Sequence, residues 1–122
     1  MPEKIIKNFY PDGVCPIRDV LNRLGDKWSM LVLITIHANG TMRFNEVHKS
    51  IKDISQRMLT VTLRTLEEDG LISRKVYAEV PPKTEYNLTR MGKSLIPHIE
   101  DLVNWASLNM DHIIKSRETT NK

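Results

Sequence analysis

The chain has 122 residues, 40% of them hydrophobic and 27% charged, a composition typical of one soluble globular domain. Its 18 basic and 15 acidic residues give a net charge of +3, which by itself does not indicate a nucleic acid as partner. The single cysteine excludes an internal disulfide, and no apolar run is long enough to cross a membrane. We therefore expect a cytoplasmic protein with no signal peptide and no membrane partner.

The N-terminal third is expected to contain an arm and two helices. Residues 1–14 form the arm, because two prolines and a glycine interrupt any helix there. Pro16 suits the first turn of a helix, and the apolar residues after it keep helical spacing until Gly25. Asp26 can cap the next helix, expected over residues 27–38, whose middle is apolar on nearly all sides. Such a helix belongs in the centre of the domain or against a partner subunit.

Two helices joined by a short turn are expected next, after a very short strand at residues 41–43. The first helix covers residues 44–51. Ser55 is placed to cap the second helix, and Gly70 is placed to end it. The inward face of this second helix is a stripe of leucines at helical spacing: Leu59, Leu63 and Leu66.

The outward face of the second helix carries side chains suited to the major groove of DNA. Residues 43–64 include five basic and two acidic residues, so positive charge is concentrated in this segment. A local cluster matters more than the total charge, because phosphate neutralisation is local. An outward-facing valine is also a poor choice for a helix that only meets water. The outward face consists of Gln56, Arg57, Thr60, Val61 and Arg64.

A β-hairpin is expected after these helices. Residues 72–77 and 84–88 alternate in the manner of strands, and the loop between them contains two prolines. Two helices joined by a short turn and followed by a hairpin form a winged helix-turn-helix. The expected fold is therefore mainly α with a small β-hairpin.

A last helix is expected to mediate dimerisation. Thr89 is placed to cap it, and Pro97 is expected to kink or restart it. Its apolar stripe is longer than the core of one small domain needs, so we expect two chains to form a homodimer through it. Residues 116–122 are polar and are expected to form a flexible tail. The residues expected at the dimer interface are Leu95, Ile99, Leu102, Trp105 and Ala106.

The DNA-facing residues can be given separate roles. Only the N-terminal half of such a helix normally reaches base edges. There Arg57 offers forked donors to guanine, Gln56 can pair with adenine, and Val61 can contact a thymine methyl group. Arg64 is expected on phosphate, and the acidic residues 67–69 are expected to remain in solvent. Basic residues of the hairpin either contact the DNA or are simply solvated. The full set expected to bind DNA is Arg43, Ser55, Gln56, Arg57, Thr60, Val61, Arg64, Arg74, Lys75 and Lys83.

A series of motifs runs in unbroken order from residue 15 to residue 106, including CPI, GDKW, RFNEV, ISQRML, LRTLEEDGLISR and EVPPKTEYNLT. In these motifs the chain resembles the HxlR-type winged helix-turn-helix transcriptional regulators. The resemblance implies a homodimer that binds inverted repeats near promoters and represses or activates transcription. It places one domain at residues 15–115, including the C-terminal dimerisation helix. Asp26 stands where the family usually has a second glycine, a difference that affects a turn or cap.

Cys15 is a candidate redox sensor. A thiol just ahead of Pro16, at a helix N-terminus, feels a partial positive charge that lowers its pKa. Some members of the HxlR-type family carry a cysteine at this place that senses oxidants, quinones or aldehydes. The alternative is an inert thiol retained for packing. Without a second cysteine, an oxidised Cys15 must pair with another chain or with a small thiol.

Catalytic and metal-binding functions have little support in the sequence. The four histidines lack metal-ligand spacing, and one cysteine cannot build a zinc site, so neither a metal nor a cofactor is expected. No nucleophile and base pair is visible, so we do not expect an enzyme. His48 is expected to be solvated or to face phosphate. The alternative to a DNA-binding regulator is a winged-helix module that binds another protein without sequence-specific DNA binding. No feature identifies an effector.

Overall fold

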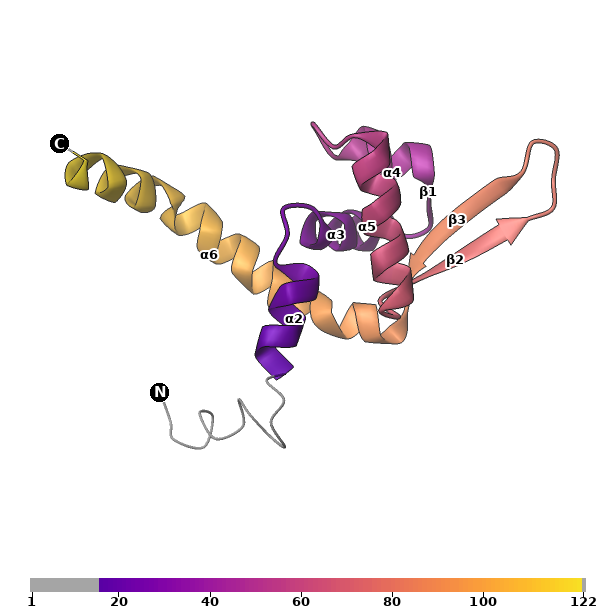
Figure 1. The fold of residues 1–122 in the computed structure, drawn as a ribbon, viewed down its shortest axis with the longest axis horizontal. Coiled ribbons are helices and arrows are strands. Elements are labelled where there is room, and N and C mark those ends of the chain that lie inside the picture. The colour runs from indigo at the N-terminus through magenta and orange to yellow at the C-terminus, as the bar shows by residue number, and fades with distance from the viewer. Residues whose placement is uncertain (1–15, 122) are drawn as a thin grey trace.

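The computed structural model describes residues 16–121 (Figure 1). They form a mainly helical fold with a small three-stranded antiparallel sheet, which confirms the expected fold class. The elements in chain order are α2 (Pro16–Leu24), α3 (Ser29–Asn39), β1 (Met42–Arg43), α4 (Phe44–Ser50), α5 (Gln56–Glu68), β2 (Ile72–Tyr77), β3 (Lys83–Leu88) and α6 (Arg90–Thr120).

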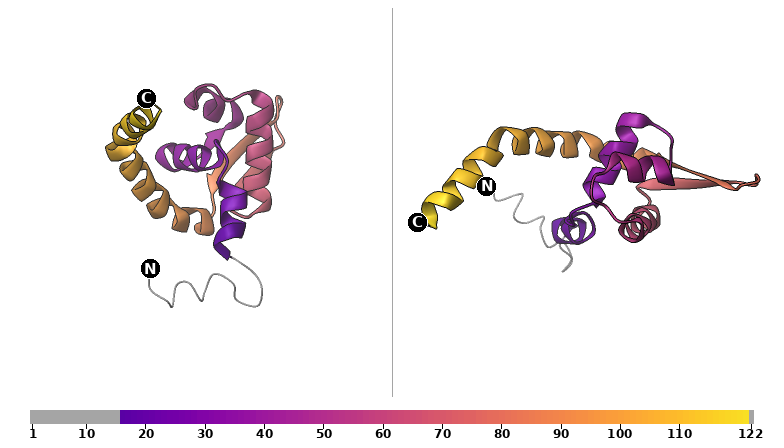
Figure 2. Two further views of the ribbon diagram at one scale, coloured as in Figure 1. Left: turned by 60° about the vertical axis from the view of Figure 1, so that its left-hand side comes forward. Right: turned by 90° about the horizontal axis from the view of Figure 1, so that it is seen from above.

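Helix α3 is the centre of the hydrophobic core. It lies between α5 and α6 (Figure 2) and also contacts β3 and α4. Its side chains Val32, Leu33 and Ile36 are at most 1% exposed. Burying a side chain of this size stabilises the folded state by about 1.5–3 kcal/mol. The apolar character of α3 on nearly all sides therefore reflects its contact with four surrounding elements.

Side-chain caps fix the starts of three helices. Oδ2 of Asp26 accepts hydrogen bonds from the amides of Trp28 and Ser29 at 3.1 and 3.2 Å, and α3 begins at Ser29, two residues later than expected. Oγ of Ser55 accepts from the amide of Met58 at 3.0 Å. Oγ1 of Thr89 accepts from the amide of Gly92 at 3.0 Å, and the Thr89 hydroxyl donates to the carbonyl of Gly70 at 2.6 Å. The start of α6 is thereby tied to the chain segment that follows α5.

The sheet is formed by the hairpin and the short strand β1. Strand β3 lies in the middle, with β1 and β2 antiparallel on its two sides. Met42 and Tyr86 are paired across β1 and β3, and both are buried, as is Ile72 on β2. Strand side chains alternate between the two faces of a sheet. One face of this sheet therefore packs against the hydrophobic core, and the other face is turned away from it.

Helix α6 is continuous over 31 residues and contains Pro97. Of the two expected effects of Pro97, a kink or a restart, the restart does not occur, and the ribbon of α6 changes direction along its length (Figure 1). A proline lacks only one amide, and neighbouring hydrogen bonds can hold the helix through it. The tail expected at residues 116–122 is helical as far as Thr120.

The hairpin and the C-terminal half of α6 project from opposite sides of the helical body (Figure 1). The first turn of α6 packs closely on the connection between α5 and β2, because a Cβ added at Gly92 would overlap the carbonyl oxygen of Leu71. Among residues 16–121, no helix combines the length and the apolar character needed to cross a membrane.

Candidate nucleic-acid interface

The turn between α4 and α5 is held by a side-chain hydrogen bond. Nε2 of His48 on α4 donates to the carbonyl of Ile54 at 3.0 Å, and the imidazole stacks on Phe44. Asp53 in the turn has a φ of 71°, a left-handed conformation that aspartate tolerates better than most residues. The expectation that His48 is solvated or faces phosphate did not include this contact, which uses Nε2 of a half-buried ring inside the protein.

Helix α5 has the two faces that its sequence predicts. Leu59, Leu63 and Leu66 are at most 2% exposed, and they hold the helix against α3 and β2. Thr62 is also buried, at 4% exposure, which the leucine stripe alone does not reveal. Val61 on the other side is 50% exposed. The outward residues Gln56, Arg57, Thr60, Val61 and Arg64 are all exposed on one surface.

The hydrogen-bonding capacity of this surface is partly used within the helix. The Thr60 hydroxyl donates to the carbonyl of Gln56 at 2.8 Å, so it can meet a ligand only as an acceptor or through its methyl group. Within residues 16–121, neither Arg57 nor Arg64 forms an ion pair or a side-chain hydrogen bond. Both guanidinium groups are therefore available to an external acceptor.

The acidic C-terminal end of α5 contacts basic side chains from other elements. Oε1 of Glu67 lies 3.5 Å from Nε of Arg74 on β2, and Oδ1 of Asp69 lies 2.8 Å from Nη1 of Arg23 on α2. The expectation that residues 67–69 remain in solvent is therefore wrong for these two carboxylates. Their partners are remote in sequence or belong to another element, so helical periodicity gives no sign of them.

The hairpin of β2 and β3 is the wing of the winged helix-turn-helix. Most of its charged residues lie on the face of the sheet turned away from the core. Glu85 on β3 lies between Arg43 on β1 and Lys75 on β2 in the strand register. Oε2 of Glu85 is 3.4 Å from Nζ of Lys83. The Tyr77 ring lies under both ammonium groups, 5.0 Å from Lys75 and 4.7 Å from Lys83. Three cations are thus gathered around one carboxylate and one aromatic ring.

These contacts change the ionisation of Glu85. A hydrogen bond from the Tyr77 side chain is the main cause that lowers the pKa of Glu85. Desolvation opposes this effect, while Lys83 and then Arg43 lower the pKa further. The carboxylate is therefore charged at neutral pH and offsets part of the positive charge on this face.

Arg74 lies on the opposite face of the sheet from Lys75 and Lys83. It is paired in register with Tyr86, whose pKa is raised mainly by burial. A groove of about 200 Å³ between α5 and the sheet is lined by Phe44, Thr60, Leu63, Arg64, Glu67, Arg74 and Tyr86. The expected DNA-binding residues thus fall into two groups, one around α5 and this groove and one on the outer face of the wing. Lys83 begins β3 and is paired, so it is not a free cation at the hairpin tip.

The residues expected at a dimer interface do not share one environment. Ile99 is 4% exposed in the core of its own chain, and Leu95 packs against that core. Leu102 and Trp105 are 50% and 54% exposed on the projecting half of α6, with Ala106 half-buried beside them. Further exposed apolar residues that the expectation did not include are Met91, Val103, Leu108, Met110 and Ile114 on α6 and Ile17, Val20 and Leu21 on α2.

Cys15, the candidate redox sensor, lies outside the described residues. In the described part of the chain, no group of three or more histidine, cysteine, aspartate or glutamate side chains could hold a metal ion. The surface formed by α5 and the wing can bind a partner through its positive charges and its free hydrogen-bonding groups.

Comparisons with known proteins agree with this geometry. The HxlR-like helix-turn-helix family matches residues 23–114. An uncharacterized HTH-type transcriptional regulator of Methanothermobacter thermautotrophicus is 47% identical over 105 residues, which cover 86% of this chain and 79% of that protein. A protein from Salmonella typhimurium named as a transcriptional regulator superposes with a TM-score of 0.76 at 35% identity, covering 85% of this chain and 92% of that chain. The redox regulator HypR in its reduced form superposes with a TM-score of 0.73 at 40% identity, covering 82% of this chain and 98% of that chain.

The family match spans the end of α2, the helix-turn-helix, the hairpin and most of α6. The matched segment therefore includes both groups of basic residues, the one around α5 and the one on the outer face of the sheet, together with most of α6. The solved relatives share both the fold and a substantial part of the sequence. The chain belongs to the HxlR-like helix-turn-helix family of transcriptional regulators.

Proposed function

We propose that the protein is a homodimeric transcriptional regulator that acts in the cytoplasm on an inverted-repeat operator. Each protomer inserts α5 into a major groove and lays its wing along the flanking DNA backbone. The observation that carries this proposal is the outward surface of α5. There Arg57 and Arg64 form no ion pair within residues 16–121, and they lie beside residues able to contact base edges.

The residues on α5 have different roles along the helix. Gln56, Arg57, Thr60 and Val61 lie in the first half and contact base edges. Arg64 lies about 10 Å further along the axis than Arg57, as seven residues of helix require. It lines the groove beside the wing and contacts phosphate.

The wing supplies contacts that position the protein. Arg43, Lys75 and Lys83 present a positively charged surface on the outer face of the sheet, and Arg74 lies next to α5. Such contacts to phosphate fix register without reading sequence. Ser55 caps α5 through its oxygen and keeps its hydroxyl proton for a phosphate.

The projecting half of α6 forms the dimer interface. At 100° per residue, Leu102, Trp105, Ala106 and Ile113 fall on one side of the helix, with Val103, Met110 and Ile114 at its edge. An apolar surface of this extent is unusual on a monomer and is normally covered by a partner. A second copy of α6 provides a matching surface through two-fold symmetry.

Arg57→Ala tests the proposal directly. The operator is first selected from random duplexes in the presence of competitor DNA. The Arg57→Ala variant is expected to lose about tenfold or more in operator affinity and to discriminate less at one base position. Lys115→Ala near the end of α6, on the opposite side of that helix from Ile113, also removes one positive charge far from α5 and should bind as the wild type does. The alternative module that binds only protein would show no sequence-selective DNA retardation above about 0.15 M salt.

A redox function of Cys15 is a second proposal, which the similarity to HypR favours, because that protein is a redox regulator with solved oxidised and reduced forms. Oxidation by diamide removes two electrons from two thiols, either of two Cys15 residues from different chains or of Cys15 and a small thiol. A non-reducing gel and mass spectrometry of the treated wild type should show a crosslinked dimer or a thiol adduct. Cys15→Ser should show neither, and an unmodified wild type would refute the proposal.

A further inference from the structure

The groove of about 200 Å³ between α5 and the sheet is the place where the Tyr86 hydroxyl reaches the surface. Tyr86 is only 9% exposed, and its hydroxyl forms no hydrogen bond with any other residue that the structure describes. The oxygen is still open to solvent, because Oδ2 of Asp69 is the only sealed side-chain oxygen or nitrogen without a partner in the same part of the chain. The buried ring of Tyr86 therefore places an unused hydroxyl in the groove.

Charged groups on both walls of the groove act on this hydroxyl. Arg74 on β2 is paired with Tyr86 in the strand register, so the two side chains lie on the same face of the sheet. Burial raises the pKa of Tyr86, while Arg74 lowers this pKa and Glu67 on α5 raises it. The hydroxyl thus lies within electrostatic range of both charges. It keeps its proton at neutral pH and is available as a hydrogen-bond donor.

The groove has the charge of a site for a monoanion. The carboxylate of Glu67 lies 3.5 Å from the guanidinium of Arg74 and offsets its charge. Arg64, which also lines the groove, forms no ion pair within residues 16–121, so one positive charge remains. A backbone phosphate of DNA carries one negative charge, whereas a phosphate monoester carries roughly 1.5 to 2 at neutral pH. The small volume also favours a single phosphate group over a whole metabolite.

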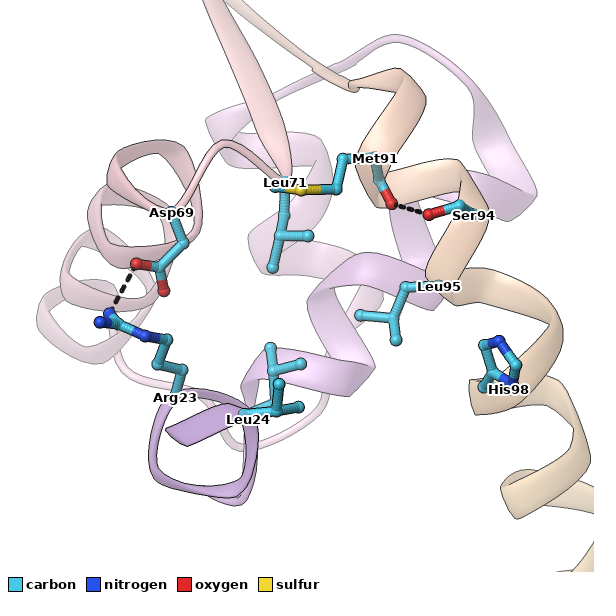
Figure 3. Close-up of a pocket in the computed structure, with 9 residues that line it drawn as sticks. Arg23, Leu24, Asp69, Leu71, Met91, Ser94, Leu95 and His98 are labelled. Carbon is cyan, nitrogen blue, oxygen red and sulfur yellow. Dashed lines mark hydrogen bonds and ion pairs between the residues drawn. The ribbon is translucent and has the colours of Figure 1, made fainter. Parts of the chain in front are cut away.

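The apolar cavity of about 330 Å³ between α2, the end of α5 and the start of α6 differs in this respect (Figure 3). Its polar side chains are mostly paired within the protein. Nη1 of Arg23 donates to Oδ1 of Asp69 at 2.8 Å, and the Ser94 hydroxyl donates to the carbonyl of Met91 at 2.6 Å. The groove beside Tyr86 is therefore the better site for an anion.

We propose that this groove holds one phosphate of the DNA backbone, with the Tyr86 hydroxyl and the Arg64 guanidinium both donating hydrogen bonds to its oxygens. The site rests on the proposed function, because its ligand is the DNA that α5 and the wing bind. Tyr86 belongs to β3 and Arg64 to α5. One phosphate thus joins the sheet to the reading helix and fixes the position of the helix in the groove of the DNA.

Tyr86→Phe removes the hydroxyl and keeps the ring in the core. Its affinity for the operator should fall about tenfold, because a hydrogen bond to a charged group is lost. An unrelated duplex should lose a similar factor, since a phosphate contact carries no sequence information. The salt dependence should not change, because a neutral hydroxyl releases no counterion. The thermal unfolding midpoint should also stay the same, since no hydrogen bond within the described part of the chain is lost.

Operator duplexes in which one phosphate at a time is replaced by a neutral methylphosphonate locate the contact. At one position in each half-site, the wild type and Tyr86→Phe should bind with nearly equal affinity, and Arg64→Ala should lose its disadvantage at the same position. At all other positions the tenfold difference should persist. The absence of such a position, or different positions for the two variants, would overturn the proposal.

Two further results separate this site from the proposed function. An operator that the wild type and Tyr86→Phe bind equally well would overturn the phosphate site alone, whereas a wild type that retards no duplex would overturn both. Inorganic phosphate, titrated without DNA, tests for a free anion. Binding of inorganic phosphate at micromolar concentrations that Tyr86→Phe abolishes would identify a free anion as the occupant and overturn the assignment to DNA.

Discussion

Arg74 on β2 lies 3.5 Å from Glu67 on the last turns of α5, so an ion pair joins this helix to the wing. Both side chains are partly exposed, at 48% and 37%, and such pairs contribute little to folding stability. The pair instead keeps Arg74 beside α5, where the carboxylate of Glu67 offsets the positive charge of the Arg74 guanidinium. Its effect should therefore be seen in DNA binding more than in stability.

Glu67→Gln is expected to strengthen operator binding by roughly threefold, because it removes a negative charge near phosphate and releases Arg74. The free energy of unfolding should change by less than about 1 kcal/mol. Affinity is measured as a function of salt, and its dependence should become steeper by about one unit of slope. Glu118→Gln near the end of α6 is the control, with the same change of charge far from the wing. Weaker operator binding by Glu67→Gln would contradict this assignment.

Arg64→Ala is expected to weaken binding to all DNA sequences by a similar factor and to reduce the salt dependence by about one unit. The reason is that Arg64 lines the groove beside the wing and is assigned to phosphate. Titration of the operator and of an unrelated duplex, each at several salt concentrations, measures both quantities. A loss confined to the operator would instead identify Arg64 as a base-reading residue.

Glu85 should make stability depend on acid. Its pKa in the folded protein is lowered from the ordinary value of 4.5, so its stabilising effect is fully present above that value. The effect is lost as the pH falls through the lowered pKa, where the carboxylate is protonated in both states. The difference in free energy of unfolding between wild type and Glu85→Gln should be constant near neutral pH and shrink below pH 4.5.

Denaturant titrations at several pH values measure this difference. Glu79→Gln serves as the control, since the Glu79 side chain forms no ion pair within the described residues. A Glu85→Gln difference that does not change with pH would contradict the role of Tyr77 and Lys83 in holding the carboxylate charged.

Gly92→Ala is expected to destabilise the protein by about 1–3 kcal/mol, because the new methyl group overlaps the carbonyl oxygen of Leu71. The first turn of α6 would have to move away from the segment after α5. Chemical denaturation of Gly92→Ala measures the loss. Lys93→Ala, on the next and exposed residue, should be close to neutral. A Gly92→Ala variant as stable as the wild type would show that this packing can relax without cost.

Trp105→Glu is expected to convert the proposed dimer to a monomer, because it places a charge in the apolar face of α6. Asn104→Glu is the matched control, because Asn104 is exposed on the opposite side of the helix from Leu102 and Ile113. Sedimentation velocity gives the oligomeric state of each variant. Two dimeric variants, or two monomeric ones, would argue against this interface. The monomer should also bind an inverted repeat more weakly, since it contacts one half-site.

The local patterns of the sequence predicted the elements that depend on nearby residues. The two-faced helix α5, its cap at Ser55 and the cap at Asp26 follow from spacing and side-chain chemistry over a few positions. The winged helix-turn-helix followed from the order of such elements. Each of these features depends on residues that lie within one or two helical turns, or within one strand, of each other.

The contacts that were not predicted join residues far apart in the chain. Asp69 is 46 residues from Arg23, and no periodicity relates the two. The contact between His48 and the carbonyl of Ile54 depends on the path of the turn between α4 and α5. Helical spacing does not specify that path, so the sequence predicts only solvent or phosphate for this ring. Ile99 continues the apolar stripe of α6, but only the packing of α6 on α3 shows that its partner is the chain's own core.

Helix α6 begins directly at the segment that ends α5, where Thr89 and Gly92 contact Gly70 and Leu71. From that point its 31 residues extend over about 45 Å. In a dimer joined at the far half of α6, the two reading helices would therefore be separated by a pair of long arms. A rotation of a few degrees at the root of each arm would displace the reading helices by several ångströms, enough to change whether both fit successive major grooves. Control of DNA binding would then require only a small adjustment at this root.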